Sequence, residues 1–249
     1  MVFMVKLTRN LKGKIGSDCL SFEKKYLDKE REELLSYLKG NNLTGIELGV
    51  ATGDFSDRMI KSNRFKHFFG VDMYADHHDT VEYVDALKKI GIFSPYKLLR
   101  MKFDEAIDLF EDDCFDFVYI DGYAHNGEDG GRAIYSWLKK VKPNAIIAGH
   151  DYHKDWPLVI EAVDNLCKQL KTTLYITQTT TDPGAQDNYP SWMIIKSENF
   201  DNSSQLYVPQ KLCKKAELAD KKYLKINSLK TKVRKSVKNF ADKIFGNDT

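Results

Sequence analysis

The sequence lacks the features that mark secreted, disulfide-bonded and membrane-spanning proteins. Four cysteines stand far apart and form no CxxC pair, so they indicate neither a zinc knuckle nor a disulfide framework. No apolar run approaches the roughly 20 residues that a membrane span requires. The opening stretch MVFMVKLTRNLKGK has too short an apolar part for a secretory signal. We therefore expect a soluble globular protein of the cytoplasm.

Internal repeats and low-complexity tracts are also lacking. The 249 residues, 42% hydrophobic and 30% charged, suffice for one α/β domain with an appendage. The net charge of +2 is unevenly distributed, because residues 211–243 hold eleven Lys and one Arg against three acids. We expect an acidic body and a basic tail.

Strand-like and helix-like segments alternate from residue 45 onward. The expected strands cover residues 45–50, 67–74, 96–101, 115–121, 145–151, 174–179 and 191–196. The expected helices cover residues 21–40, 55–62, 80–91, 103–112, 130–141 and 157–170. The last two strands are joined by a polar loop without a helix, which predicts antiparallel neighbours. The pattern predicts an α/β fold with a doubly wound, seven-stranded, mostly parallel sheet and a terminal antiparallel strand.

The turn after the first expected strand carries candidate binding residues. Residues 45–56 read GIELGVATGDFS, in which Gly49 and Gly53 bracket a turn that lets a ligand approach the backbone. In doubly wound sheets, ligands bind at the carboxyl ends of the strands, so this turn is a favoured position. The spacing is ExGxxxG and not the GxGxxG of nicotinamide-binding proteins, because Ala51 and Asp54 occupy the second and third glycine places.

Two acids at strand ends indicate the charge of the ligand. Glu47 lies inside the first strand, where a carboxylate would repel a pyrophosphate and attract an ammonium group. Asp72 ends the second strand, nineteen residues after Gly53, where an acid can accept both hydroxyls of a ribose. Together they predict a cofactor that has a ribose and a positively charged end.

These residues resemble motif I and the following acidic position of class I S-adenosylmethionine-dependent methyltransferases, over about residues 43–196. YIDGYAH and IIAGHDY resemble the branch that includes macrocin-type sugar O-methyltransferases and cephalosporin-hydroxylase-like proteins. The resemblance implies a cofactor-binding domain at 43–197, between an N-terminal helical segment (1–42) and a basic tail with an amphipathic helix (198–249). The residues that it implies for cofactor binding are Glu47, Gly49, Ala51, Gly53, Asp72, Met73, Met101, Lys102 and Asp121.

The same resemblance gives a role to the charged ends of the fourth and fifth expected strands. Several relatives hold a magnesium ion there with one acid after strand four and a pair of acids after strand five, which implies Asp121 and Asp151 as metal ligands. His150 replaces the first acid of that pair, and imidazole is a poorer ligand for a hard cation. The expected cofactors are S-adenosylmethionine and, if two acids are enough to bind the ion, Mg²⁺.

The catalytic candidates are His125, His150 and Asp151. A histidine that titrates near neutrality can take the proton from a hydroxyl during methyl transfer. The alternatives are that His125 is a solvent-exposed loop residue and that His150 is packed at a strand end. We expect O-methylation of a sugar or other small hydroxyl acceptor, in cell-surface polysaccharide or natural-product biosynthesis.

A metal-dependent hydrolase or hydroxylase is the alternative function. It would use Asp121, His125, His150, Asp151 and His153 around a metal ion. This alternative explains the strand ends but gives no role to Glu47 and Asp72.

The basic tail carries an apolar stripe at helical spacing. Its members are Ile226, Leu229, Val233, Val237, Phe240 and Ile244. Such a helix can dock on the body or on a second subunit of a homo-oligomer, or lie on an anionic membrane at the inner face. Nucleic acid is disfavoured, because the stripe lacks interleaved aromatic residues. The expected partners are thus a small-molecule or glycan acceptor and a peripheral membrane contact.

Overall fold

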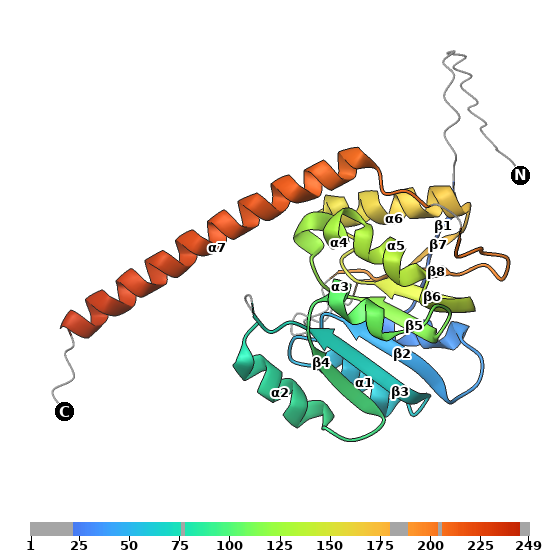
Figure 1. The fold of residues 1–249 in the computed structure, drawn as a ribbon, viewed down its shortest axis with the longest axis horizontal. Helices are drawn as coiled ribbons and strands as arrows, with labels where there is room; N and C mark the ends of the chain where they lie inside the picture. Colours follow the sequence, from blue (N-terminus) through green and yellow to red (C-terminus); the bar gives the residue numbers. More distant parts are fainter. Residues whose placement is uncertain (1–21, 76–77, 180–188, 204–205, 245–249) are drawn as a thin grey trace, which may run out of the picture.

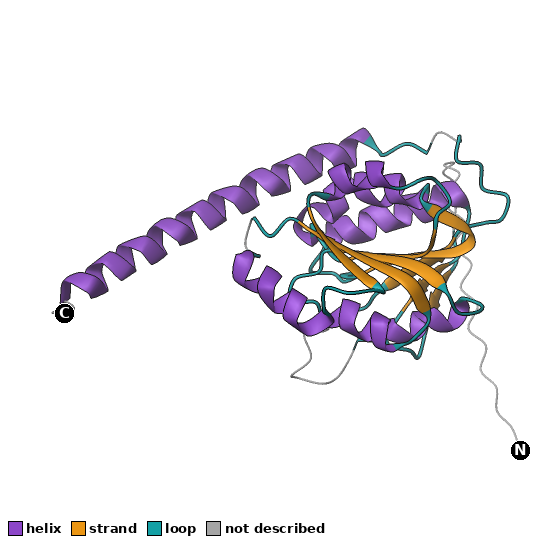
Figure 2. Cartoon of the chain, turned by 60° about the horizontal axis from the view of Figure 1, so that its bottom comes forward, coloured by secondary structure: helices purple, strands orange, loops and turns teal. Residues whose placement is uncertain are grey.

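The computed structural model describes residues 22–75, 78–179, 189–203 and 206–244, with the side chains of the last segment described as far as Leu229. Eight strands form one twisted sheet in the order β1-β7-β8-β6-β5-β2-β3-β4, with helices on both faces (Figure 1, Figure 2). The strands are β1 (Lys24–Tyr26), β2 (Leu43–Leu48), β3 (Phe65–Asp72), β4 (Tyr96–Arg100), β5 (Phe115–Ile120), β6 (Val141–Gly149), β7 (Leu174–Ile176) and β8 (Trp192–Ile195). The expected doubly wound α/β fold is confirmed.

Helices follow most strands and cover both faces of the sheet. The α-helices are α1 (Asp54–Lys61), α2 (Thr80–Ile90), α3 (Phe103–Ala106), α4 (Gly127–Gly130), α5 (Arg132–Leu138), α6 (Pro157–Leu170) and α7 (Gln210–Ile244). The 3-10 helices are η1 (Arg31–Tyr37), η2 (Ile107–Leu109) and η3 (Ala124–Asn126). Because successive side chains of β5 point to opposite faces, Val118 and Ile120 join the core under α5 and α6, while Phe117 and Tyr119 join the core under α1 and η1.

The reversed strand lies inside the sheet. β8 pairs antiparallel with β6 on one side and with β7 on the other, as the helix-free loop predicted. Most of that loop lies outside the described residues. The other pairs are parallel, so the carboxyl ends of β2, β3, β5 and β6 meet at one edge.

The helix expected at residues 21–40 is wrong, and so is the count of seven strands. Lys24–Tyr26 forms an eighth strand that pairs parallel with β7, and a 3-10 helix follows at Arg31–Tyr37. The edge of β7 offers backbone hydrogen bonds, from Leu174 N–H to the Glu23 carbonyl at 2.8 Å and from Leu27 N–H to the Ile176 carbonyl at 2.7 Å. The sequence pattern does not show these partners, because they lie far away along the chain.

The segment between β5 and α5 is more ordered than the expected loop. It forms η3 and α4, and two consecutive residues inside α4, Glu128 and Asp129, have φ of 56° each. A left-handed conformation costs a residue with a side chain roughly 1–2 kcal/mol. The surrounding contacts therefore have to offset this strain, and it becomes relevant to the site below.

The helix α7 starts on the body and then leaves it. Its first turns pack on α4, α6 and η3, and its remaining length extends away from the sheet (Figure 1). Within the described ranges, no helix is both long and apolar enough to cross a bilayer.

Gly49 is the residue on which the contact between the β2 loop and the end of β5 most depends. It has φ of 95°, and a Cβ atom added there would lie 2.0 Å from the carbonyl oxygen of Asp121. Gly40 has a similar φ of 74° but open space around it. Gly40→Ala is therefore a matched control for backbone strain without a clash.

We predict that Gly49→Ala destabilises the protein much more than Gly40→Ala does. The control should lose about 1 kcal/mol of unfolding free energy, or a few degrees in Tm. Gly49→Ala should lose on the order of 3 kcal/mol, because the added methyl group can be accommodated only if the backbone at Asp121 moves. Thermal unfolding followed by circular dichroism compares the two, and equal shifts would contradict the proposed close contact.

Candidate functional site

The loop after β2 is held by the carboxylate of Asp72. One oxygen of this side chain accepts hydrogen bonds from the backbone N–H groups of Val50 and Ala51, both at 3.0 Å. The other oxygen accepts from the N–H of Tyr74 at 3.1 Å. The Tyr74 hydroxyl in turn donates to the Ala51 carbonyl at 2.8 Å. Asp72 thus shapes the loop that the sequence identified, and its expected contact with a ribose stays a prediction.

The other expected cofactor residues gather at the same edge. Gly53 has φ of 83° and precedes α1, and the Ala51 backbone is also left-handed, with φ of 47°. Met101 follows β4, and its N–H donates to the Asp72 carbonyl at 3.1 Å. Met73 follows Asp72 directly, and Lys102 stands exposed at the start of α3.

Glu47 is buried behind this loop. Its side chain is 2% exposed and accepts a short hydrogen bond from the Ser56 hydroxyl, which also contacts the Tyr96 hydroxyl at 3.2 Å. Burial is the main reason that its pKa rises to about 8, and the charge of Asp121 adds to the rise. Arg31 opposes it. Without a cationic ligand, Glu47 is therefore largely protonated at neutral pH.

We predict that Glu47→Gln stabilises the ligand-free protein at high pH. Between the ordinary glutamate pKa of 4.5 and the folded-state pKa of about 8, the folded protein holds a proton on Glu47 that the unfolded chain releases. The native protein must then lose stability as pH rises through that window, by up to a few kcal/mol. Glutamine cannot ionise, so the advantage of the variant should grow from pH 5 to pH 8.

Urea unfolding of both proteins at pH 5 and pH 8 measures this difference. Glu111→Gln changes an acid at an exposed position and serves as the control. An advantage of Glu47→Gln that is the same at both pH values would contradict the raised pKa.

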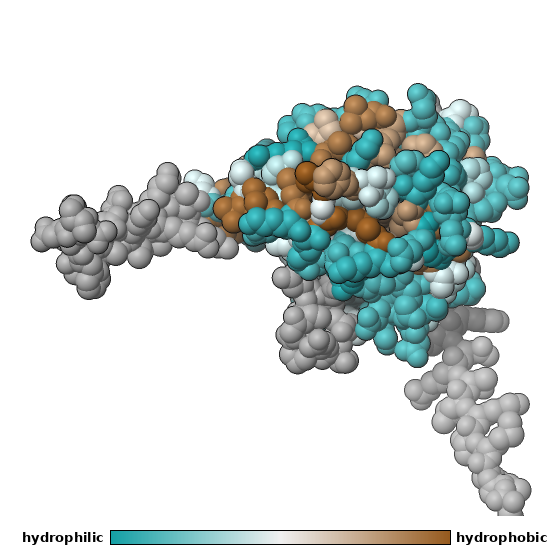
Figure 3. Space-filling view, turned by 90° about the horizontal axis from the view of Figure 1, so that it is seen from below, coloured by the Kyte–Doolittle hydropathy of each residue, from teal (hydrophilic) through white to brown (hydrophobic). Residues whose placement is uncertain are grey.

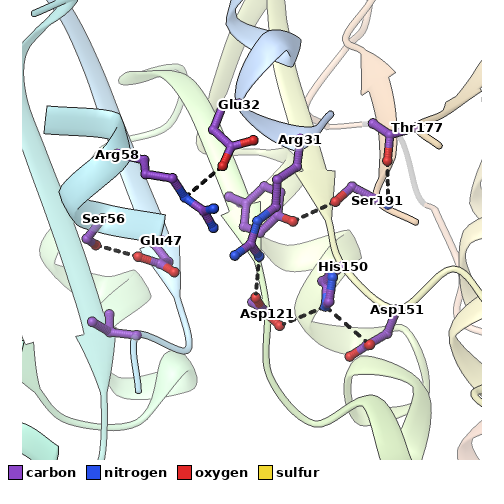
Figure 4. Close-up of polar contacts among 12 residues, drawn as sticks. Arg31, Glu32, Glu47, Ser56, Arg58, Asp121, His150, Asp151, Thr177 and Ser191 are labelled. Carbon is purple, nitrogen blue, oxygen red and sulfur yellow. Dashed lines mark hydrogen bonds and ion pairs between the residues drawn. The ribbon is translucent and has the colours of Figure 1, made fainter. Parts of the chain in front are cut away.

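A second cluster stands where β5 and β6 end (Figure 4). His150 lies between two carboxylates, with Nδ1 at 3.5 Å from Oδ1 of Asp121 and at 3.2 Å from Oδ1 of Asp151. Arg31 approaches Asp121 from the opposite side, with Nη1 at 3.2 Å from Oδ2. By distance alone, Asp121, His150 and Asp151 form a group that could hold a metal ion.

The charges in this cluster are complementary. Burial by itself would lower the pKa of His150, but Asp121 and then Asp151 outweigh it and raise the pKa to about 10. Burial would raise the pKa of Asp121, yet His150 and Arg31 hold it below its usual value. At neutral pH, two cations therefore face two carboxylates.

Arg31 was not identified from the sequence. Its side chain is buried at 8% exposure, and its guanidinium stacks over the Phe55 ring at 4.8 Å from the centroid. Arg31 belongs to η1, outside the expected cofactor domain, and an arginine in a charged segment gives no signal of its own. Only the return of η1 to the sheet brings it to Asp121.

Glu128 was also missed. It is 1% exposed, and its Oε2 has no hydrogen-bond partner among the described residues. Burial raises its pKa well above the usual range, and the nearby charges of Asp151 and Asp121 raise it further. A strained, left-handed backbone holds this buried acid near the cluster, and GEDGG in the sequence resembles an ordinary polar turn.

The arrangement does not fit Mg²⁺. This ion prefers oxygen ligands in octahedral geometry. Here both oxygens of Asp121 already face cationic donors, and the other two members are the Asp151 carboxylate and an imidazole that contacts both acids through one nitrogen. A divalent ion would have to displace Arg31 or His150, so the site is already neutralised by the chain itself.

His125 lies apart from this cluster. Its Nε2 pairs with Oδ1 of Asp220 on α7 at 2.8 Å, and its ring stacks on Tyr223 at 4.0 Å between centroids. His153 pairs with Asp155, with 3.4 Å between Nδ1 and Oδ2. The structure brings together Asp121, His150 and Asp151 and pairs the rings of the other two candidate histidines with other acids, although the His153 N–H donates to the Asp151 carbonyl at 2.7 Å. A catalytic role for His125 stays a prediction without contact support.

A family model described as a methyltransferase domain matches residues 46–152, which include the loop after β2 and both charged strand ends. Among curated proteins, the chain has no match. The structure is similar to an rRNA methylase from Streptococcus thermophilus, at 14% identity, over 67% of this chain and 93% of that one, with a TM-score of 0.51. It is also similar to the O-methyltransferase from Bacillus cereus in complex with SAH, at 13% identity, over 66% and 79%, with a TM-score of 0.50.

A third structure is an S-adenosylmethionine-dependent methyltransferase from Mesorhizobium loti, at 19% identity and a TM-score of 0.38. The match covers 49% of this chain and about half of that chain, 53%. The family model covers less than half of the chain, and the solved structures show a shared fold. They select neither the acceptor nor the macrocin-type and cephalosporin-hydroxylase-like branch.

Proposed function

We propose that the protein transfers the methyl group of S-adenosylmethionine to a hydroxyl oxygen of a small acceptor, with sugars as the favoured class. The observation that carries this proposal is the loop after β2, bounded by Glu47 and Asp72, inside the segment that matches a methyltransferase domain. One fold neighbour described as an O-methyltransferase agrees with transfer to oxygen. The preference for a sugar rests on the sequence resemblance alone.

The cofactor would lie along the carboxyl ends of β2 and β3. Glu47 would become ionised when the ammonium of the methionine part approaches, because an opposite charge favours the carboxylate. Asp72 would bind the ribose hydroxyls while it keeps the loop in shape. Met101 and Lys102 would border the adenine.

The chemistry requires a base and an aligned acceptor. As the acceptor oxygen forms its bond to the methyl carbon, the bond from that carbon to sulfur breaks, and the hydroxyl proton must leave. Asp151 follows β6 at the site edge and is the proposed proton acceptor, held by His150. The positive charges of His150 and Arg31 would favour the loss of that proton, and alignment supplies most of the rate.

The contacts of the described histidines do not support the hydrolase or hydroxylase alternative. It needs His125 and His153 near Asp121 and Asp151, and both rings pair with other acids instead. The comparisons give it no support.

We predict that Asp72→Ala and Glu47→Gln weaken the binding of S-adenosylmethionine at least tenfold. Hydrogen bonds that involve a charged group are worth roughly 1.5–3 kcal/mol, and tenfold corresponds to about 1.4 kcal/mol. Isothermal titration calorimetry measures the Kd, with Glu111→Gln as the control. If folded variants bind the cofactor as tightly as the native protein does, the cofactor assignment is wrong.

We predict that turnover survives EDTA and is lost in Asp151→Asn. Release of S-adenosylhomocysteine from a panel of sugars and other hydroxyl compounds identifies an acceptor and measures the rate. Asp151→Asn should lose about 10²–10³-fold in kcat, as expected for a base, with cofactor Kd nearly unchanged.

His125→Ala is the comparison variant, because its ring contacts α7 and not the cluster. It should keep most of the rate. A loss as large as that of Asp151→Asn would return the role of base to His125, and activity that EDTA abolishes and Mg²⁺ restores would refute the metal-free site.

A further inference from the structure

The first four turns of α7 are fixed on the body by packing and by charge. Leu212 and Ala216 are fully buried, and a Cβ atom at Gly130 would already stand 3.0 Å from Cβ of Ala216. Asp220 accepts from Asn126 at 2.8 Å and pairs with His125. The direction in which the helix leaves is therefore set by η3 and α4.

Beyond Tyr223, the described apolar side chains of α7 no longer pack on the body of the protein. Leu224, Ile226 and Leu229 are 66%, 41% and 53% exposed. Figure 3 shows hydrophobic atoms gathered where α7 leaves the body, beside its grey continuation. The sequence continues the stripe with Val233, Val237, Phe240 and Ile244, all within the helix, which ends at Ile244.

A free helix of this kind would be marginal in water, because most helix stability comes from packing of an apolar face. The charge of this segment indicates which kind of surface covers its apolar stripe. Residues 221–244 hold eight Lys and one Arg against a single acid, Asp242. Two copies of this segment would repel each other, whereas an anionic lipid surface would attract each one.

The position of α7 relative to the site is the second part of the argument. The helix contacts η3, and η3 begins three residues after Asp121. The docked end of α7, from which the projecting part continues, therefore lies beside the segment that follows the charged cluster at the β5 end.

We propose that residues 224–244 form an interfacial helix that binds anionic lipid and holds the catalytic domain at a membrane surface. The apolar stripe enters the interface, and the basic residues contact the headgroups. This attachment concerns the surface of the protein and does not depend on the identity of the acceptor.

Vesicle co-sedimentation of the full chain tests the proposal. Vesicles of phosphatidylcholine alone are compared with vesicles that also contain phosphatidylglycerol, at low salt. The native protein should sediment with the anionic vesicles and remain in solution with the neutral ones, and added salt should weaken the binding.

Two full-length variants separate the stripe from exposed leucines in general. Ile226→Ser with Leu229→Ser should weaken vesicle binding about tenfold or more, because burial of each side chain contributes to the partitioning. Leu109→Ser removes a leucine of similar exposure, 58%, from η2 and should bind like the native chain. Far-ultraviolet circular dichroism and calorimetry with S-adenosylmethionine verify that each variant is folded.

Three results would overturn the proposal. Complete recovery of the native chain in the supernatant with both kinds of vesicle excludes lipid binding, and equal sedimentation with both excludes recognition of anionic lipid. Unchanged binding by the double-serine variant excludes the stripe. A dimer seen by light scattering that the two serine substitutions dissociate, without vesicle binding, assigns the stripe to a second copy of the chain.

Discussion

The site depends on the neutralisation of two carboxylates at the carboxyl edge of the sheet. Asp121 and Asp151 project from the neighbouring strand ends of β5 and β6, where each would repel the other in a partly buried setting. His150 and Arg31 supply the opposite charges, one from the strand end itself and one from the N-terminal segment. Breaking a buried ion pair leaves an uncompensated charge. The pair between Arg31 and Asp121 therefore holds the N-terminal segment on the domain in addition to its packing.

The same charge balance connects the two halves of the site. The charge of Asp121 raises the pKa of Glu47 and the charge of Arg31 lowers it. Glu47 also lies behind the loop that Asp72 holds. A ligand with a positive end would therefore meet an acid whose ionisation the ligand itself promotes. Under the proposed function, the acceptor side would have its cations built into the chain, and the acid on the cofactor side would be neutralised by the ligand.

Strain is concentrated between these features and α7. Glu128 and Asp129 both adopt left-handed backbone in the short segment that follows Asp121. That segment holds the buried acid of Glu128 on its inner side and receives α7 on its outer side, where Asn126 and His125 contact Asp220. Strained backbone persists only where surrounding contacts offset its energetic cost, and it clusters at functional sites.

The fold class, the central strands and the loop after β2 could be predicted from the sequence. Apolar runs, the ExGxxxG spacing and the acid of Asp72 are local signals, and parallel strands bring their carboxyl ends together by geometry alone. The helix Pro157–Leu170 matches the expected bounds of 157–170, and its proline stands in the first turn, where proline is tolerated. The pairing of β7 with β8 followed from the absence of a helix between them.

Three features were decided only by the tertiary structure. The strand Lys24–Tyr26 forms because β7 has a free edge, Arg31 reaches Asp121 because η1 returns over the sheet, and His125 faces α7 because that helix crosses η3. Each depends on a partner 90 or more residues away along the chain, and no local pattern carries such information. The sequence by itself determined which residues reach the carboxyl edge of the central strands, because local apolar runs mark where each strand ends and parallel strands share one carboxyl edge. The tertiary structure decided which charges meet there, because the pairing of distant side chains depends on how the ends of the chain return to the sheet.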